Sequence, residues 1–170
     1  MSNRNERILI IDDNPAIHED FRKILGATKP SNTKWLDAKA ALFGETLPAG
    51  DESQFEIDSA YQGREGLELV EKALGEGRPY ALAFVDVRMP PGWDGVETIT
   101  RLWQSYPELQ VVSCTAYSDY SWEQIIRQLG KSDSLVILKK PFDNVEVLQL
   151  AHALTEKWFV SQEARARMRD

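Results

Sequence analysis

The chain has 170 residues, of which 42% are hydrophobic and 28% charged, and its formal net charge is -7 at pH 7. This length and composition suit one globular domain with appendages, which can bury a core without disulfides; the single cysteine cannot form an internal one. The acidic charge argues against nucleic acid as a partner, and the lack of a long apolar run or a signal-peptide core predicts a cytoplasmic protein without membrane insertion.

Short apolar segments alternate with amphipathic ones along the chain. Five strands are predicted, at residues 8–11, 55–60, 81–85, 111–114 and 135–138. Each is followed by a predicted helix, over residues 15–26 and on apolar faces at 67–74, 96–103, 125–129 and 147–158. Nearly all-apolar strands that alternate with helices indicate a parallel sheet covered on both faces. The sequence therefore predicts a doubly wound, five-stranded α/β domain.

Local signals mark several helix ends. Pro15 suits the first helical position, and Gly26 is a plausible stop. Ser121 with Gln124, and Asp143 with Glu146, have the spacing of a capping box. These signals predict helix starts close to residues 15, 121 and 143.

Two stretches lie outside this alternation. Residues 27–54 are too long for a simple connection, and we expect a helical insertion that either packs on the domain or binds a partner. At the other end, a roughly heptad-spaced stripe runs from Val147 to Trp158 and fades into a polar tail. We assign residues 1–160 to one domain and residues 161–170 to a C-terminal helical extension, which either dimerises or leads into an output module.

Polar residues stand at the carboxyl ends of the predicted strands, which meet at one edge of a parallel sheet. They are Asp12 and Asp13 after the first strand, Asp86 after the third, Thr115 after the fourth and Lys140 after the fifth. Three converging carboxylates repel one another unless a cation lies among them. Mg2+ prefers oxygen ligands and leaves positions open for a phosphoryl oxygen, while Lys140 adds a charge and Thr115 a hydroxyl. Asp12 and Asp13 alone would equally suit a helix cap; the added Asp86 favours a metal site.

Four ordered blocks at these strand ends carry a resemblance to a known family. They read ILIIDDNP, FVDVRMPPGWDG, VVSCTAY and LKKPFD. In these blocks the chain resembles the receiver domain of two-component response regulators, from Ile8 to about Trp158 except for the insertion. The resemblance implies a flavodoxin-like fold and raises the possibility that the chain is excised from a larger hybrid signalling protein.

The resemblance also implies roles for the site residues. Asp86 would accept a phosphoryl group from a phosphohistidine on a histidine kinase or phosphotransfer protein. Asp12 and Asp13 would hold Mg2+ together with Asp86, and the main-chain carbonyl of Arg88 would complete the protein ligands. Lys140 would bind a phosphoryl oxygen, and Thr115 would reorient toward it and so transmit the signal. Such a module is a signalling phosphoacceptor that catalyses only its own phosphorylation and dephosphorylation, and its output lies in a partner or another domain.

The blocks also depart from the family pattern. The segment MPPGWDG places Gly95 one residue farther from Asp86 than is usual, and Trp93 in it would shield the site, dock a partner or pack on the following helix. Arg88 and Tyr117 stand at positions that tune dephosphorylation in the family, and because both are bulky the resemblance implies slow dephosphorylation. Ile137 stands where the family often has an aromatic switch residue, so we expect another route for the signal.

Two other functions remain open. A Mg2+-dependent aspartyl-phosphate phosphatase would need an Asp-x-Asp pair after the first strand, and the segment Asp12-Asp13-Asn14 does not match it. An unphosphorylated receiver-like interaction module is disfavoured because every charged and hydroxyl site residue is present.

Cys114 is predicted to be a small core residue. His18 and His152 lack neighbouring ligand residues and are interpreted as structural or exposed. The bond between Lys140 and Pro141 is expected to be cis.

Overall fold

The computed structural model describes residues 6–26, 55–88, 92–116, 122–129 and 134–169. The predicted insertion at 27–54 lies outside these residues. So do Tyr117 and Ser121, and with them the first of the two predicted capping boxes.

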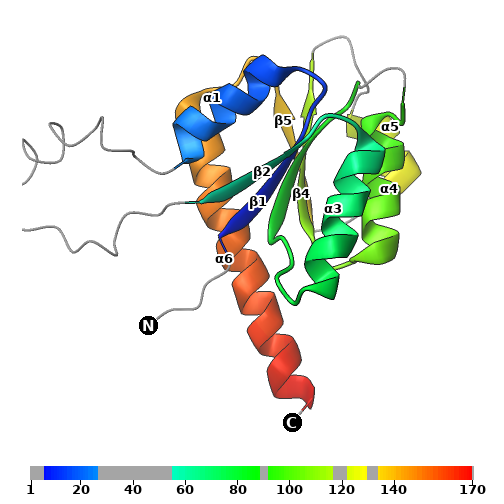
Figure 1. Ribbon diagram of the computed structural model, residues 1–170, viewed down its shortest axis with the longest axis vertical. Helices are drawn as coiled ribbons and strands as arrows, with labels where there is room; N and C mark the ends of the chain where they lie inside the picture. Colours follow the sequence, from blue (N-terminus) through cyan, green and yellow to red (C-terminus); the bar gives the residue numbers. More distant parts are fainter. Residues whose placement is uncertain (1–5, 27–54, 89–91, 117–121, 130–133, 170) are drawn as a thin grey trace, which may run out of the picture.

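A five-stranded parallel sheet forms the centre of the domain (Figure 1). Its strands are β1 (Arg7–Ile11), β2 (Glu56–Ala60), β3 (Leu82–Asp86), β4 (Gln110–Thr115) and β5 (Leu135–Lys139). The strand order is β2-β1-β3-β4-β5, and every neighbouring pair is parallel. The prediction of a doubly wound α/β fold is confirmed, and the strand ends lie within a residue of those expected.

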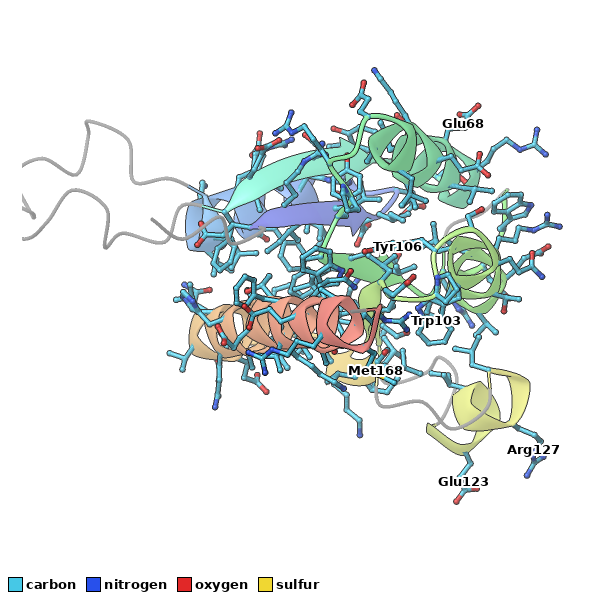
Figure 2. All side chains as sticks on the ribbon, turned by 90° about the horizontal axis from the view of Figure 1, so that it is seen from below. Glu68, Trp103, Tyr106, Glu123, Arg127 and Met168 are labelled. Carbon is cyan, nitrogen blue, oxygen red and sulfur yellow. The ribbon has the colours of Figure 1, made fainter. Side chains whose placement is uncertain are left out.

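Helices cover both faces of the sheet. They are α1 (Pro15–Leu25), α3 (Gly63–Gly75), α4 (Gly95–Ser105), α5 (Trp122–Leu129) and α6 (Asn144–Arg169). Figure 1 shows α1 and α6 on one face and α3, α4 and α5 on the other. The view from below in Figure 2 shows the same layers, with α6 seen nearly end-on and Glu123 and Arg127 of α5 pointing away from the domain.

Alternation along β1 divides the core into two hydrophobic clusters. Leu9 and Ile11 belong to the cluster under α3 and α4, whereas Ile8 and Ile10 belong to the cluster under α1 and α6. Successive strand side chains point to opposite faces. The even-numbered side chains of β1 therefore point to the face covered by α1 and α6. Asp12, which directly follows β1, is the next even-numbered residue.

The expected cap signals are present at two helices. Pro15 is the first residue of α1, the Asn14 side chain accepts a hydrogen bond from the Ala16 amide, and Gly26 ends the helix. At α6 the Asp143 amide donates to the Glu146 carboxylate at 3.1 Å, which is one half of the predicted capping box.

The helix α6 has 26 residues and extends beyond the sheet (Figure 1). Its predicted apolar stripe is buried, and it consists of Val147, Ala151, Leu154 and Trp158. At the end of this stripe and beyond it, the helix contacts the α4–β4 connection. The indole N–H of Trp158 donates to the Tyr106 hydroxyl at 2.8 Å, and Arg165 lies 3.4 Å from Glu108. The helix is continuous across residue 160, so the proposed domain limit there stays a prediction. Among the described residues, no helix is long and apolar enough to cross a membrane.

Candidate functional site

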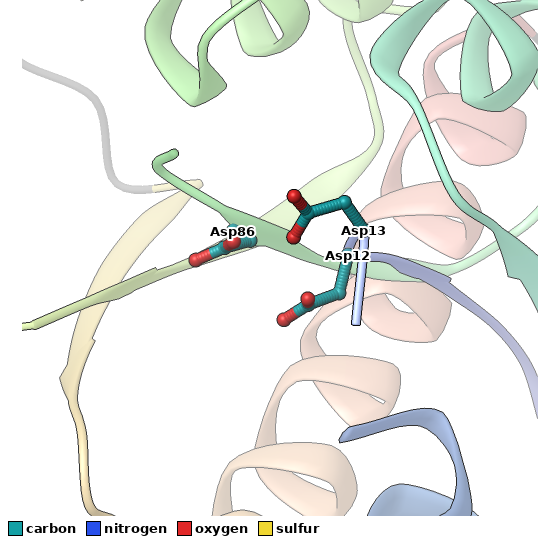
Figure 3. Close-up of side chains that lie close together, drawn as sticks. All are labelled: Asp12, Asp13 and Asp86. Carbon is teal, nitrogen blue, oxygen red and sulfur yellow. The ribbon is translucent and has the colours of Figure 1, made fainter. Parts of the chain in front are cut away.

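Three acidic side chains converge at the carboxyl ends of β1 and β3 (Figure 3). Asp12 and Asp13 directly follow β1, and Asp86 is the last residue of β3. β1 and β3 are neighbouring strands. The chain places β2 on one side of β1 and β3 on the other, and in a doubly wound fold ligands bind at the carboxyl ends of the strands where the strand order switches in this way. One carboxylate oxygen from each of the three residues lies within 4.8 Å of the others.

Lys140 joins this cluster from the end of β5. Its Nζ lies 2.9 Å from Oδ1 of Asp86 and 3.4 Å from Oδ2 of Asp12. The neighbouring Lys139 is exposed, as expected from strand alternation. The bond between Lys140 and Pro141 is cis, as predicted.

The cluster is short of positive charge. Burial is the main cause that raises the pKa of Asp86 to about 6; the hydrogen bond from Lys140 opposes the rise, and the nearby Asp12 carboxylate adds to it. Burial likewise raises the pKa of Asp12. One ammonium group cannot neutralise three carboxylates. A hard divalent cation fits this donor set, because all three side chains offer oxygen ligands within reach of one ion.

Thr115 and Arg88 lie at the same edge of the sheet, at the ends of β4 and β3. Thr115 is buried at the end of β4, and its hydroxyl donates to the Ala116 carbonyl at 3.0 Å. Asp86 pairs with Cys114 in the register of β3 and β4. Because successive side chains alternate, the Thr115 side chain points to the face of the sheet opposite to that of Asp86. Arg88 is exposed two residues beyond Asp86. The roles of both residues stay proposals.

Sequence reasoning assigned no site role to His18. The structure buries it to 1% exposure and places its Nε2 2.7 Å from the main-chain oxygen of Asp12. His152, in contrast, is exposed. The spacing of His18 from Phe21 and Leu25, which fill the same face of α1, was a signal that His18 points inward.

Trp93 packs against two helices, α3 and α4. Its ring lies 4.3 Å from the guanidinium carbon of Arg101 in α4 and 5.7 Å from that of Arg64 in α3. A β-carbon at Gly63 would come within 3.1 Å of the Trp93 ring. Of the expected alternatives for Trp93, these contacts match packing on the helices.

Cys114 is buried, as predicted for a core residue. Burial raises the pKa of its thiol far above the ordinary value. Because the thiolate is the reactive form, this environment suits a packing role. Ile137 is half-buried and packs against the cluster under α3 and α4.

Comparison with solved structures places the fold among receiver domains. A receiver domain protein described as CheY-like, from Methanospirillum hungatei JF-1, is 20% identical, with a TM-score of 0.63 over 92% of this chain and 98% of that chain. The REC domain of AraT, a response regulator from Geobacillus stearothermophilus, is 22% identical, with a TM-score of 0.64 over 93% and 98% of the two chains. A structure described as an adenylate cyclase from Rhodopirellula baltica is 19% identical, with a TM-score of 0.70 over 98% of each chain.

Comparison by sequence identifies the family. A search of curated proteins found no match. The model of the response regulator receiver domain family matches residues 41–152, which include Asp86, Thr115 and Lys140. Asp12 and Asp13 precede the matched segment, and they reach the site because β1 lies between β2 and β3. Since the match spans more than half of the chain and the fold agrees with it, the chain belongs to the response regulator receiver domain family.

Proposed function

We propose that this receiver domain takes a phosphoryl group onto Asp86 from a phosphohistidine of a histidine kinase or phosphotransfer protein. The observation that carries the proposal is the contact of Lys140 Nζ with Asp86 Oδ1 at 2.9 Å, inside a cluster of three acids whose oxygens lie within 4.8 Å. Family membership and the arrangement of these groups at the strand ends support it.

The chemistry is an in-line displacement governed by position and charge. A carboxylate oxygen of Asp86 attacks the phosphorus, a new O–P bond forms, and the N–P bond of the phosphohistidine breaks. The electron pair of that bond returns to the imidazole ring, which takes up a proton. Water later attacks the acyl phosphate and releases inorganic phosphate, which restores the Asp86 carboxylate.

The other site residues prepare Asp86 for this reaction. Asp12, Asp13, Asp86 and the carbonyl of Arg88 would hold Mg2+, which when bound neutralises charge on the transferring phosphoryl oxygens. Lys140 keeps its ammonium group against Asp86 and is in place to bind a phosphoryl oxygen. Such a module is a signalling phosphoacceptor, and it catalyses only its own phosphorylation and dephosphorylation.

Thr115 is proposed to carry the signal away from the site. Its hydroxyl is bonded to the Ala116 carbonyl, and its main-chain oxygen accepts from the Lys140 amide at 2.8 Å. A new hydrogen bond from the Thr115 hydroxyl to the phosphoryl group would replace the bond to the Ala116 carbonyl, and the main-chain bond to Lys140 would remain. The altered β4 end would then act on a partner, an output domain, or a second copy of the chain through α6.

Intact mass spectrometry tests the proposal. The wild type is incubated with Mg2+ and acetyl phosphate, alongside Asp86→Asn and the exposed control Asp20→Asn. We expect the wild type and Asp20→Asn to gain one phosphoryl group and Asp86→Asn to gain none. A gain of one phosphoryl group by Asp86→Asn would show that another residue is the acceptor. No gain by the wild type, with metal binding shown separately, would favour the unphosphorylated interaction module.

A further inference from the structure

His18 is a buried polar residue on an otherwise apolar helix face. It is 1% exposed and lies in α1 with Phe21 and Leu25. Its Nε2 is 2.7 Å from the main-chain oxygen of Asp12. Because a carbonyl oxygen can only accept a hydrogen bond, Nε2 carries a proton and donates it to this contact.

The rest of the imidazole packs against an aromatic ring. Its ring centroid lies 4.5 Å from that of Tyr61, at an interplanar angle of 47°. Its Nδ1 is buried and has no hydrogen-bond partner within the described part of the chain. A buried polar group without a partner destabilises a fold. The bond to Asp12 is therefore the one polar contact in the described residues that accounts for a histidine here.

That contact completes the anchoring of Asp12. The Asp12 amide donates to the Ala60 carbonyl at 3.0 Å, and Oδ1 of Asp12 accepts from the Asn14 amide at 2.9 Å. The oxygen held by His18 belongs to the peptide group that joins Asp12 to Asp13. Because a peptide group is planar, fixing its oxygen also fixes the start of Asp13. One imidazole thus orients the main chain that carries two of the three acids.

We propose that His18 is a positioning residue for the metal site: its N–H holds the peptide between Asp12 and Asp13 so that both carboxylates face Asp86. This inference rests on the proposed Mg2+ site. It assigns His18 no contact with the metal or the phosphoryl group. Groups that orient metal ligands from behind typically change metal affinity by about 10- to 100-fold when they are removed.

Two substitutions separate the hydrogen bond from packing. His18→Phe keeps a ring beside Tyr61 and removes the N–H. His18→Gln has an amide whose N–H can reach the position of Nε2, and it gives up the ring. If the hydrogen bond positions the acids, His18→Gln retains metal affinity and His18→Phe loses it. If only packing matters, the order is reversed.

The readout is metal binding without phosphorylation. Mn2+ serves as the probe, and its free concentration is measured by electron paramagnetic resonance during titration of the folded protein. We expect His18→Phe to bind Mn2+ about tenfold more weakly than the wild type and His18→Gln to stay within about twofold. Equal affinity of His18→Phe and the wild type would overturn the inference, as would a weaker affinity for His18→Gln than for His18→Phe.

A second comparison keeps the test decisive if His18→Phe does not fold. His18→Asn carries the same amide on a shorter side chain that falls short of the Nε2 position, so it should bind more weakly than His18→Gln. Equal binding by these two variants would also overturn the inference. If the proposed metal site does not exist, the result is different: the wild type and Asp13→Asn would then bind Mn2+ with equal affinity.

Discussion

Gly95 lies directly against the main chain of Asp86. A β-carbon at residue 95 would come within 2.6 Å of the Asp86 carbonyl oxygen and 2.7 Å of the Val87 α-carbon. The Gly95 amide donates to the Val87 carbonyl at 2.7 Å. The first residue of α4 is thus seated on the segment that carries the proposed acceptor, and no side chain fits between them.

Gly95→Ala should therefore destabilise the protein and disturb the site together. Main-chain atoms cannot rotate away as a flexible side chain would, so we expect a loss of about 2 kcal/mol in the free energy of unfolding. Urea denaturation measures this loss, and acetyl phosphate labelling measures the accompanying fall in the rate of phosphorylation. The control is Gly75→Ala, where a β-carbon would meet nothing within 4 Å. That change should leave stability unchanged or raise it, and an equal loss in both variants would contradict the steric explanation.

Asp86→Asn should stabilise the metal-free protein in a pH-dependent way. The pKa of Asp86 is raised to about 6 in the folded protein from 3.8, so the unfolded chain loses this proton first as pH rises. The wild type then loses stability between about pH 4 and pH 6, and the neutral amide avoids this loss. We expect Asp86→Asn to be more stable by about 2 kcal/mol at pH 7 in the presence of EDTA.

The difference should shrink to a small value by about pH 4, where Asp86 is protonated in the folded wild type. Thermal or urea unfolding at several pH values checks this. The exposed Asp20→Asn is the matched control and should stay within about 0.5 kcal/mol of the wild type. A gain in stability for Asp86→Asn that is constant with pH would show that the buried charge is not its cause. Added Mg2+ should reduce the gain, because an ion that binds only the folded wild type stabilises it.

Tyr80→Phe should weaken the opposite edge of the sheet. The Tyr80 hydroxyl donates to the Asp58 carboxylate at 2.6 Å, and the Arg7 guanidinium lies over the ring at 4.5 Å from its centroid. Tyr80 is 2% exposed, and its hydrogen-bond acceptor is a carboxylate. Because removing a buried hydrogen bond to a charged group is costly, we expect the free energy of unfolding to fall by about 2 kcal/mol. Chemical denaturation measures it. Tyr61→Phe, at a ring that is 40% exposed, should change stability by less than about 0.5 kcal/mol; similar effects at both positions would argue against the Asp58 bond.

A double-mutant cycle tests the contact that ties α6 to the α4–β4 connection. Figure 2 shows Tyr106 between the helices of the two faces, where its hydroxyl accepts from the Trp158 indole at 2.8 Å. Trp158→Phe also changes packing, so only the cycle with Tyr106→Phe isolates the hydrogen bond. We expect a coupling free energy of about 1 kcal/mol from unfolding measurements. Additive effects of the two substitutions would show that the bond adds no stability.

The convergence of Asp12, Asp86 and Lys140 could be predicted because it depends only on topology. Once short apolar strands alternate with helices, the sheet is parallel and its strand ends share one edge. The buried stripe of α6 was equally readable from its spacing. These features follow from side-chain periodicity, which a sequence displays directly.

The contact between His18 and Asp12 could not be predicted in the same way. Its position on the apolar face of α1 was visible, but its partner is a main-chain oxygen, and every residue except proline offers the same main-chain groups. The direction of the Thr115 hydroxyl is a similar case, because it is set by a rotamer and a neighbouring carbonyl. Apart from helix caps, which have their own sequence signals, contacts between a side chain and the main chain leave no pattern in the sequence.

The helix α6 is also a stiff rod with one end near the acids. Its 26 residues span about 39 Å at a rise of about 1.5 Å per residue, and Asn144 at its start is only four residues beyond Lys140. A tilt of about 5° at that end would sweep the far end through about 3 Å over this length. A tilt caused by small adjustments around Lys140 would therefore be enlarged at Arg169, the end of the helix that lies farthest from the acids.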